Sequence, residues 1–397
     1  MIVDINKIKV LYRNEPAGTL QMDPASGVCV FEYDKPWLAN GFSLSPTELP
    51  LQNGLIYGNR DLFDGNFATF ENSLPDGYGL YLLDRMLCRR GSSLRGLTPL
   101  QRLSIIGTAG MGALAYLPMM PGIQTQREVD EIAQLDEIQE EALSVLSEKD
   151  SGEPSYLYYN SANSGGARPK VAMRAKDGTH WIVKFRHVYD SADTGKTELL
   201  YMNTAREAGI NIPRICLLKD KYFAIERFDI TPQGEKRHVL TAAALLKTDF
   251  RRQDVDYTNL LALTGYLTQD PAQVEEMFRR MVMNIVANNK DDHANNFSFI
   301  CDNGNWSLAP AYDITYSPQG SKGEHATSLF FNGNPGLQDV MKAGTGIRIP
   351  GARCLEIIHE VEKICSKKSY GSSMGRICSA WVRCHLLRAQ NALWFSS

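Results

Sequence analysis

A run of polar side chains between two apolar segments is the part of this chain with the clearest capacity for chemistry. The stretch NIVANNKDDHANNFSFI, residues 284–300, places two aspartates, a histidine and two asparagines side by side between a helical pattern and a strand pattern. Side chains this polar are unfavourable to bury unless each one finds a partner. The stretch is therefore either a solvated loop or a binding site for a cation or a phosphate.

A hairpin predicted directly after this stretch brings a further polar residue close to it. The segment FSFIC predicts a strand, DNGN a tight turn, and WSLAPAYD a returning strand. Antiparallel pairing about this turn puts Asn296 near residue 310, so Asp313 should lie within about 10 Å of Asn296. We expect Asp291, Asn296 and Asp313 to converge, as side chains do that hold a Mg²⁺ ion carrying substrate phosphates.

The spacing within the stretch matches the catalytic loop of protein kinases. In that loop an aspartate accepts the proton of the substrate hydroxyl and an asparagine five positions later binds the metal, as Asp291 and Asn296 would. A second metal-binding aspartate follows downstream in the same template, and Asp313 stands in the corresponding place. The cluster taken alone is explained equally well by an Asx-rich surface loop.

A lysine and a glutamate upstream supply two further parts of a kinase. Lys184 lies inside the strand pattern HWIVKF, where a kinase places the lysine that contacts the nucleotide phosphates. Glu198 lies in the first turn of the helix predicted next, well placed to meet that lysine. Two simpler interpretations stay open, a solvent-facing strand lysine and a glutamate that only stabilises the start of its helix.

A glycine loop and a hinge complete the order that a kinase requires. Gly165 and Gly166 in SANSGGARPK permit backbone N–H groups to turn toward an anion, and Arg168 and Lys170 add positive charge. The same glycines would also suit a linker. Residues 226–228 fall where a hinge would offer backbone groups to adenine.

The amino-terminal part of the chain predicts short strands and turns up to about residue 118, followed by helices. One helix is expected in GYGLYLLDRMLCRR, and another begins after the N-cap Thr98, with Pro99 in its first position, and stops at Gly107. The segment GTAGMG that follows superficially suggests a nucleotide loop. Its glycines are in the wrong order for the dinucleotide fingerprint, and a helix precedes it where a strand is required, so we interpret it as a structural turn.

The remaining segments alternate in type before the chain becomes mostly helical. Residues 125–150 are acidic with helical periodicity, and strands are expected in VAMRA, HWIVKF, INIPRICLL and YFAIERF. A helix from about Thr194 to Ala208 separates the second and third of these strands. Beyond Asp229 we expect helices up to the end of the chain, apart from the hairpin.

Composition limits the class of protein. A chain of 397 residues suggests two domains, and 43% hydrophobic with 22% charged residues is typical of a folded soluble protein. The formal net charge of −3 gives no global attraction to nucleic acid or membrane. The eight cysteines form no C-x-x-C pair, the N-terminus does not resemble a signal peptide, and no apolar run approaches the roughly 20 residues of a membrane span. We therefore expect a cytoplasmic protein with reduced thiols and no membrane contact.

With these motifs together, the sequence resembles the HipA family of bacterial serine/threonine kinases, the toxins of HipBA toxin–antitoxin pairs. The matching segments, in order, are SGGARPK, HWIVKF, EAGINIP, YFAIERFD, DDHANNFS and LAPAYDITYS. The upstream segment IIGTAGMGALAYLP is similar to the end of the small domain that these proteins carry. The resemblance covers nearly the whole chain.

The resemblance implies an α+β, protein-kinase-like two-lobed fold with a small β-rich N-terminal subdomain and an all-helical C-terminal lobe. We expect a HipA-like N-terminal subdomain at 1–120 and a helical connector at 121–150. A kinase N-lobe-like region with the phosphate loop and hinge should follow at 151–229, and the helical lobe with the catalytic loop at 230–397. The nucleotide is expected in the cleft between the last two.

The resemblance also implies a role for each candidate residue. Asp291 would accept the proton, with Lys184 and Glu198 completing the catalytic set, and Asn296 and Asp313 would bind Mg²⁺. The residues expected to bind ATP are Gly165, Gly166, Ala167, Arg168, Pro169, Lys170, Lys184, Glu226, Arg227, Phe228, His293, Tyr312, Asp313, Ile314 and Thr315.

The chain departs from the family pattern at two places. Asn295 replaces the lysine that often follows the motif D-x-H-x, which puts the contribution of that cation in doubt. Asn163 stands nearest the place where many members carry a regulatory serine. The candidates for autophosphorylation are therefore Ser164 first and Ser161 second.

The function implied is an ATP- and Mg²⁺-dependent serine/threonine protein kinase able to autophosphorylate. Its substrate would be a cytoplasmic translation factor such as an aminoacyl-tRNA synthetase. Its partner would be a HipB-like DNA-binding antitoxin, and it would contact DNA only through a complex with that antitoxin. One alternative is an inactive kinase fold that serves as partner of such a repressor, although Lys184, Asp291, Asn296 and Asp313 are all present. A second alternative is a metal-dependent phosphohydrolase built on the D-x-H pair. Such a site needs further metal ligands, and the other histidines of the sequence are not at ligand-like spacing.

Overall fold

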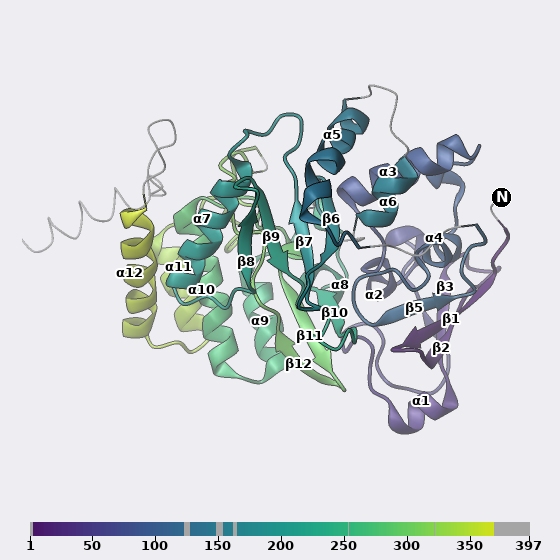
Figure 1. The fold of residues 1–397 in the computed structure, drawn as a ribbon. Coiled ribbons are helices and arrows are strands. Elements are labelled where there is room, and N and C mark those ends of the chain that lie inside the picture. Colours follow the sequence, from purple (N-terminus) through teal and green to yellow (C-terminus); the bar gives the residue numbers. More distant parts are fainter. Residues whose placement is uncertain are drawn as a thin grey trace, which may run out of the picture. The chain divides into compact units, whose positions relative to one another are not determined.

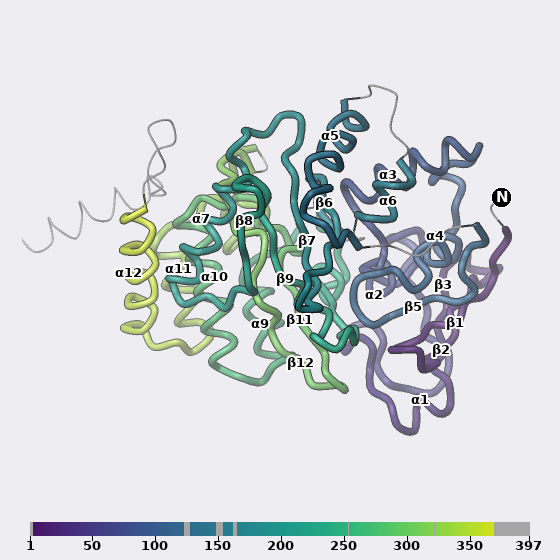
Figure 2. Tube along the Cα trace, in the orientation of Figure 1, coloured from purple at the N-terminus to yellow at the C-terminus, as the bar shows by residue number. Residues whose placement is uncertain are grey.

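The structure is a computed structural model that describes residues 3–122, 128–147, 154–161, 165–252, 254–320 and 322–368. These residues form two compact units (Figures 1 and 2). The first comprises the described parts of Met1–Lys196, Pro213–Asp249 and Ser298–Ala309, and the second those of Thr197–Ile212, Phe250–Phe297 and Pro310–Ser397. Each unit is thus assembled from segments that are separated along the chain.

The amino-terminal part of the first unit is built on a five-stranded antiparallel sheet in the order β4-β3-β2-β1-β5. Val10, Leu20 and Phe31 on its central strands are buried, and they pack in one apolar core with residues of the neighbouring helices. The elements of this part are β1 (Lys7–Tyr12), β2 (Glu15–Met22), β3 (Cys29–Tyr33), α1 (Lys35–Asn40), β4 (Ile56–Tyr57), α2 (Ala68–Glu71), α3 (Gly77–Arg89), α4 (Pro99–Ile106) and β5 (Leu114–Leu117).

Helix α4 begins and ends as its sequence predicts. Thr98 accepts a hydrogen bond from the Gln101 backbone N–H, and the Gln101 side chain accepts one from the Thr98 N–H, which completes a capping box. Pro99 takes the first helical position, and Gly107 follows the last with a positive φ of 55°. The GTAGMG segment after it forms turns, as interpreted from the order of its glycines.

The second part of the first unit contains an antiparallel sheet in the order β6-β7-β9-β8 and a three-stranded sheet in the order β10-β11-β12. Helices α3 and α5 both pack against α6, which also contacts β6 (Figure 1). The elements are α5 (Leu135–Leu146), α6 (Pro154–Asn160), β6 (Lys170–Arg174), β7 (His180–Lys184), β8 (Ile215–Leu218), β9 (Tyr222–Glu226), β10 (His238–Thr241), α8 (Ala242–Leu245), β11 (Ser298–Asp302) and β12 (Asn305–Leu308).

The predicted hairpin is present between β11 and β12. Asp302 pairs with Asn305, and Phe299 with Leu308. The two turn residues, Asn303 and Gly304, have φ values of 51° and 87°. Asparagine and glycine are the residues that tolerate this left-handed backbone best, which explains why the turn falls there.

The second unit is helical. Helix α10 is amphipathic and its central residues are buried against α9 and α12, while α11 packs on α12 (Figure 2, green to yellow). Asp270 caps the first turn of α10 by accepting a hydrogen bond from the Ala272 N–H. Asn288 ends α10 in a left-handed conformation with a φ of 59°. The helices of this unit are α9 (Tyr257–Thr268), α10 (Pro271–Ala287), α11 (Leu337–Gly346), α12 (Gly351–Lys367) and the part of α7 (Thr194–Glu207) from Thr197 onward.

The structure confirms the mixed α+β class, with a β-rich N-terminal region and a helical C-terminal region, and it corrects three details. The helix expected over residues 125–150 is shorter, since α5 begins at Leu135 after a 3₁₀ turn. Helix α6 precedes the glycine loop and was not predicted. The chain beyond Asp229 first forms β10, which was expected to be helical. The division at residues 120, 150 and 229 stays a prediction.

Two properties expected from composition can be compared with the described part of the chain. None of its helices combines the length and the apolarity that crossing a membrane requires. Its six cysteines are all free thiols, and four of them are buried (Cys29, Cys301, Cys354 and Cys365).

We predict that Thr98→Ala lowers the free energy of unfolding by about 1 kcal/mol, because it removes the oxygen that satisfies an N–H at the start of α4. Urea denaturation followed by circular dichroism measures this. Thr345→Ala is the control, since its exposed hydroxyl donates to Met341 O within α11 and caps no helix start. An equal midpoint for Thr98→Ala and the wild type would contradict the capping role.

Candidate active site

The polar stretch singled out from the sequence forms the loop that follows α10. Its backbone is held by segments from further along the chain. The Lys290 N–H donates to Ser317 O at 3.0 Å, and Lys290 O accepts from the Ala326 N–H at 3.1 Å. A single 3₁₀ turn, Ala294–Asn296, then leads into β11. The loop is therefore an ordered element with backbone partners on two other segments.

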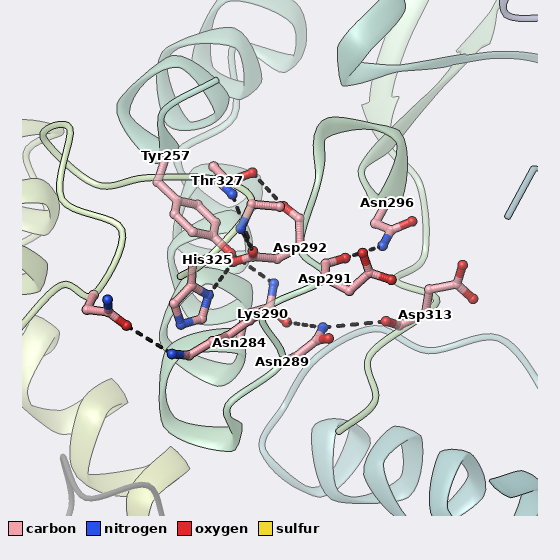
Figure 3. Close-up of polar contacts among 12 residues, drawn as sticks. Tyr257, Asn284, Asn289, Lys290, Asp291, Asp292, Asn296, Asp313, His325 and Thr327 are labelled. Carbon is pink, nitrogen blue, oxygen red and sulfur yellow. Dashed lines mark hydrogen bonds and ion pairs between the residues drawn. The ribbon is translucent and has the colours of Figure 1, made fainter. Parts of the chain in front are cut away.

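Three of the predicted site residues are linked through this loop. The Asn296 Nδ2 donates to the backbone O of Asp291 at 2.7 Å, and the Asn289 Nδ2 donates to the backbone O of Asp313 at 3.4 Å. Figure 3 shows the side chains of Asp291, Asn296 and Asp313 on the same side of the loop. The three residues thus lie together within the second unit, and their convergence on one metal ion stays a prediction.

The backbone of Asp313 is in an uncommon conformation. Its φ is 55°, in the left-handed region that residues other than glycine, asparagine and aspartate rarely adopt. Aspartate is among the few residue types that adopt this region, so the sequence permits this conformation at position 313.

The donor set of these residues fits Mg²⁺. Because the Asn296 amide nitrogen is bonded to the Asp291 carbonyl, its amide oxygen is oriented away from the loop backbone. One carboxylate, from Asp313, and one amide oxygen suit an ion that takes one or two protein ligands and completes its shell with water and phosphate. Among the described residues, no group of three or more His, Cys, Asp or Glu is placed to hold a metal.

The two neighbouring aspartates have opposite environments. The side chain of Asp291 is 61% exposed, whereas Asp292 is fully buried. Asp292 Oδ2 accepts from Tyr257 Oη at 2.5 Å and lies 2.8 Å from His325 Nδ1. Its Oδ1 accepts from the backbone N–H groups of Ala326 at 2.9 Å and Thr327 at 3.3 Å (Figure 3). Asp292 therefore anchors the loop, while Asp291 is left accessible.

This anchor is the part of the site that sequence reasoning missed. Tyr257 and His325 lie more than thirty positions away on either side of Asp292, and no local pattern connects them with it. Burial, followed by the neighbouring Asp292 carboxylate, raises the pKa of Tyr257 well above its usual value. The phenol thus remains protonated and donates its hydrogen to the carboxylate.

His293 and Tyr312 border the same loop. The His293 ring lies against Phe250, with centroids 4.9 Å apart, and its Nε2 is 3.9 Å from Asp291 Oδ1. Its Nδ1 is buried without a partner among the described residues, a condition that a bound molecule often relieves. Tyr312 donates its hydroxyl to Asn295 O at 2.6 Å, so this side chain supports the loop that carries the candidate base.

In the first unit, the glycine loop is held by a residue of the amino-terminal part. Gly166 has a φ of 98°, its N–H donates to Asp76 Oδ1 at 2.5 Å, and its carbonyl accepts from the Tyr78 N–H at 3.0 Å. A Cβ at Gly77 would overlap the Gly166 carbonyl oxygen, so only glycine permits this approach. Lys170 donates to the Gly165 carbonyl. The sequence contained no signal for Asp76.

The other predicted residues of the first unit lie on β7 and at the end of β9. Lys184 is half-buried, with its Nζ 5.6 Å from the centroid of the Phe223 ring. The Glu226 carboxylate pairs with Arg214, and the Arg227 guanidinium forms a buried bidentate pair with Asp229.

The backbone of the predicted hinge is partly engaged in the sheet. The N–H groups of Glu226 and Arg227 donate to Arg214 O and His180 O. A contact with adenine would therefore use other backbone groups of residues 226–228.

Glu198 and the two serine candidates complete the set. Glu198 is buried in α7, in the part that belongs to the second unit, and its pairing with Lys184 stays a prediction. Ser161 is buried and donates its hydroxyl to Tyr158 O at 2.9 Å. Ser164 lies outside the described residues.

Family models match most of the chain. Residues 8–117 match the HipA N-terminal domain and residues 162–368 the HipA-like C-terminal domain. The chain belongs to the HipA family. The C-terminal HipA match contains the glycine loop, Lys184 and the whole loop from Asn289 to Asn296, so the site described above lies within it.

A solved HipA structure shows the same fold. HipA of Shewanella oneidensis MR-1, in a complex with HipB and its operator DNA, aligns with a TM-score of 0.66 and 19% identity over 90% of this chain and 88% of that chain. The HipA fold is thereby shown, and with it the predicted fold class. The Helicobacter pylori proinflammatory kinase CtkA aligns with a TM-score of 0.38 and 14% identity over 57% of this chain and 89% of that chain. No curated protein matches the sequence.

We predict that the adjacent aspartates differ sharply in their effect on stability. Asp292→Ala should lower the free energy of unfolding by about 3 kcal/mol or more, because it leaves buried donors unsatisfied. Asp291→Ala should change it by less than about 0.5 kcal/mol, because that side chain is mostly exposed. Urea denaturation of the two variants, read by tryptophan fluorescence, is the measurement. Equal losses of stability would show that Asp292 is not the anchor.

Proposed function

We propose that this HipA-family chain is an ATP- and Mg²⁺-dependent serine/threonine protein kinase. The observation that carries the proposal is the geometry of the loop after α10. This loop leaves the Asp291 side chain 61% exposed, five positions before Asn296. Hydrogen bonds join the loop to itself, from Asn296 to Asp291 O, and to the segment of Asp313, from Asn289 to Asp313 O. An accessible carboxylate next to a carboxylate–amide pair is the arrangement that phosphoryl transfer from Mg·ATP requires.

Each residue of the second unit has a distinct role in this proposal. Asp291 accepts the proton of the substrate hydroxyl as that oxygen forms its bond to the γ-phosphorus and the bond to the β-phosphate oxygen breaks. Asn296 and Asp313 would hold Mg²⁺, which neutralises charge on the phosphates when bound. The His293 Nδ1, buried without a partner among the described residues, is a candidate contact for the nucleotide.

The first unit contributes the groups that bind the nucleotide. We assign Lys184 to the phosphates, the loop from Gly165 to Lys170 to the triphosphate, and residues 226–228 to adenine. These assignments are supported by the order of the motifs along the chain and by the family match that contains them.

The family match supports a proposal for the partner and for the substrate. The Shewanella HipA structure contains HipB and operator DNA, so we propose a HipB-like antitoxin as partner of this chain, with DNA contacted only through that complex. For the substrate we propose a cytoplasmic translation factor such as an aminoacyl-tRNA synthetase. A phosphoproteomic comparison of cells that express the wild type or Asp291→Ala would identify it.

We predict that Asp291→Asn abolishes phosphoryl transfer and leaves ATP binding largely unchanged, because the base acts on the incoming hydroxyl. Asp313→Ala should weaken Mg·ATP binding by about tenfold or more, because it removes a charged ligand of the metal. Transfer is measured with labelled ATP, and binding by calorimetry in the presence of Mg²⁺. Wild-type transfer by Asp291→Asn would refute the base, and a wild type without any ATP turnover would favour an inactive kinase fold.

We predict autophosphorylation at Ser164 and, less readily, at Ser161. A phosphate on Ser164 would place a charge of about −1.5 to −2 beside the triphosphate and repel it. Ser161 would first have to break its hydrogen bond to Tyr158 and leave its buried position. Incubation with Mg·ATP and mass spectrometry of residues 151–168 is the test, with Asp291→Ala as the unmodified control. The switch lies elsewhere if both serines stay bare, or if Ser164→Asp binds ATP as tightly as the wild type.

A further inference from the structure

Three buried hydrogen bonds and a fourth, partly buried one lead from Asp292 to the backbone of Asp313 (Figure 3). Tyr257 Oη donates to Asp292 Oδ2 at 2.5 Å and accepts from Asn284 Nδ2 at 3.0 Å. Asn284 Oδ1 accepts from Asn289 Nδ2 at 2.9 Å, and the same nitrogen donates to Asp313 O at 3.4 Å. This network of hydrogen bonds therefore joins the neighbour of the candidate base to the candidate metal ligand.

In each hydrogen bond of this network, the chemistry of the groups determines which one donates. The carboxylate can only accept, so the Tyr257 hydroxyl must donate to it, which leaves the phenol oxygen to accept from Asn284. The Asn284 amide then has its oxygen available for Asn289. All four side chains are at most 3% exposed, so water does not compete for the three bonds among them, whereas the bond to Asp313 O is partly buried. A buried network of this kind specifies one arrangement of the segments that it joins.

The orientation of the Asn289 side-chain amide favours the hydrogen bonds of its nitrogen over those of its oxygen. Its Oδ1 is buried without a partner among the described residues, whereas its Nδ2 contacts both Asn284 and Asp313. An unsatisfied buried acceptor is unfavourable. The amide is thus oriented for the partners of its nitrogen, which are the network and the backbone of Asp313.

We propose that Tyr257, Asn284 and Asn289 are positioning residues that set the place of Asp313 relative to the loop bearing Asp291. None of them was assigned a role from the sequence, and the inference rests on the kinase function proposed above. The network acts on the carbonyl of Asp313, whose backbone is in the left-handed region with a φ of 55°. Loss of one hydrogen bond in the network leaves the nucleotide-binding groups of the first unit unchanged. It shifts the proposed metal ligand, Asp313, away from the proposed base, Asp291.

The test is Tyr257→Phe, which keeps the ring and removes the hydroxyl that joins Asp292 to Asn284. The kcat per folded molecule should fall about tenfold, and the KM for Mg·ATP should rise by less than it does in Asp313→Ala, because the metal ligand is displaced and not removed. Tyr222→Phe is the control, because it also removes the hydroxyl of a buried tyrosine that donates to an aspartate at 2.5 Å, here in a partly buried bond to Asp136 of the first unit. That control should keep the wild-type kcat.

A second readout needs neither ATP nor metal. Amide hydrogen exchange in residues 311–317 should become about tenfold faster in Tyr257→Phe than in the wild type and stay unchanged in Tyr222→Phe. Asn289→Leu, which removes the bond to Asp313 itself, should reproduce the faster exchange. This variant keeps the comparison informative if Tyr257→Phe folds poorly.

The possible results separate this inference from the proposed function. A wild type without phosphoryl transfer refutes the kinase, and the exchange measurement still tests the network. An active wild type together with an unchanged kcat in folded Tyr257→Phe overturns the positioning role. Unchanged exchange in residues 311–317 for both Tyr257→Phe and Asn289→Leu overturns the network as the support of Asp313.

Discussion

The second unit depends on one constraint, the burial of the Asp292 carboxylate. A carboxylate removed from water is unfavourable unless donors surround it. Here they come from Tyr257 at the start of α9 and from residues 325–327, so two segments distant in sequence must meet at the loop after α10. The loop gains a defined position because these donors reach the carboxylate only while the three segments meet.

That constraint also accounts for the accessibility of Asp291. With its neighbour fixed in the interior, Asp291 lies on the other side of the loop, where most of its side chain meets solvent. The bond from Asn296 to the Asp291 carbonyl then closes the loop on itself before β11 begins. A structural aspartate and a candidate catalytic one are thus held in place by the same few hydrogen bonds, although only one of them is available to a substrate.

The glycine loop in the first unit is governed by a different restriction, the close approach of two backbones. Gly77 and Gly166 both have positive φ, and Asp76 accepts from the loop N–H that Gly166 presents. The start of α3 therefore supports a loop that lies almost ninety residues later. This contact gives the N-terminal domain of the chain a physical role in the conformation of the region predicted to bind phosphates.

The sequence by itself determined the local elements and the candidate residues on them. The capping box at Thr98, the turn at Asn303 and Gly304, and the position of Lys184 in a strand follow from short-range preferences that few neighbours can override. That Asn296 and Asp313 lie near one another was predictable for the same reason, since one short hairpin fixes the register between the segments that carry them.

Only the tertiary structure decided which of two adjacent aspartates is buried and what holds the glycine loop. The partners of Asp292 and Gly166 are separated from them by dozens of residues, and hydrogen bonds over such distances leave no periodic trace in a sequence. Strand β10 was missed because its four residues form a strand only by pairing with β11, a contact that lies sixty residues further on. Local patterns predict which chemistry a chain can offer, whereas long-range packing selects the side chains that remain accessible to perform it.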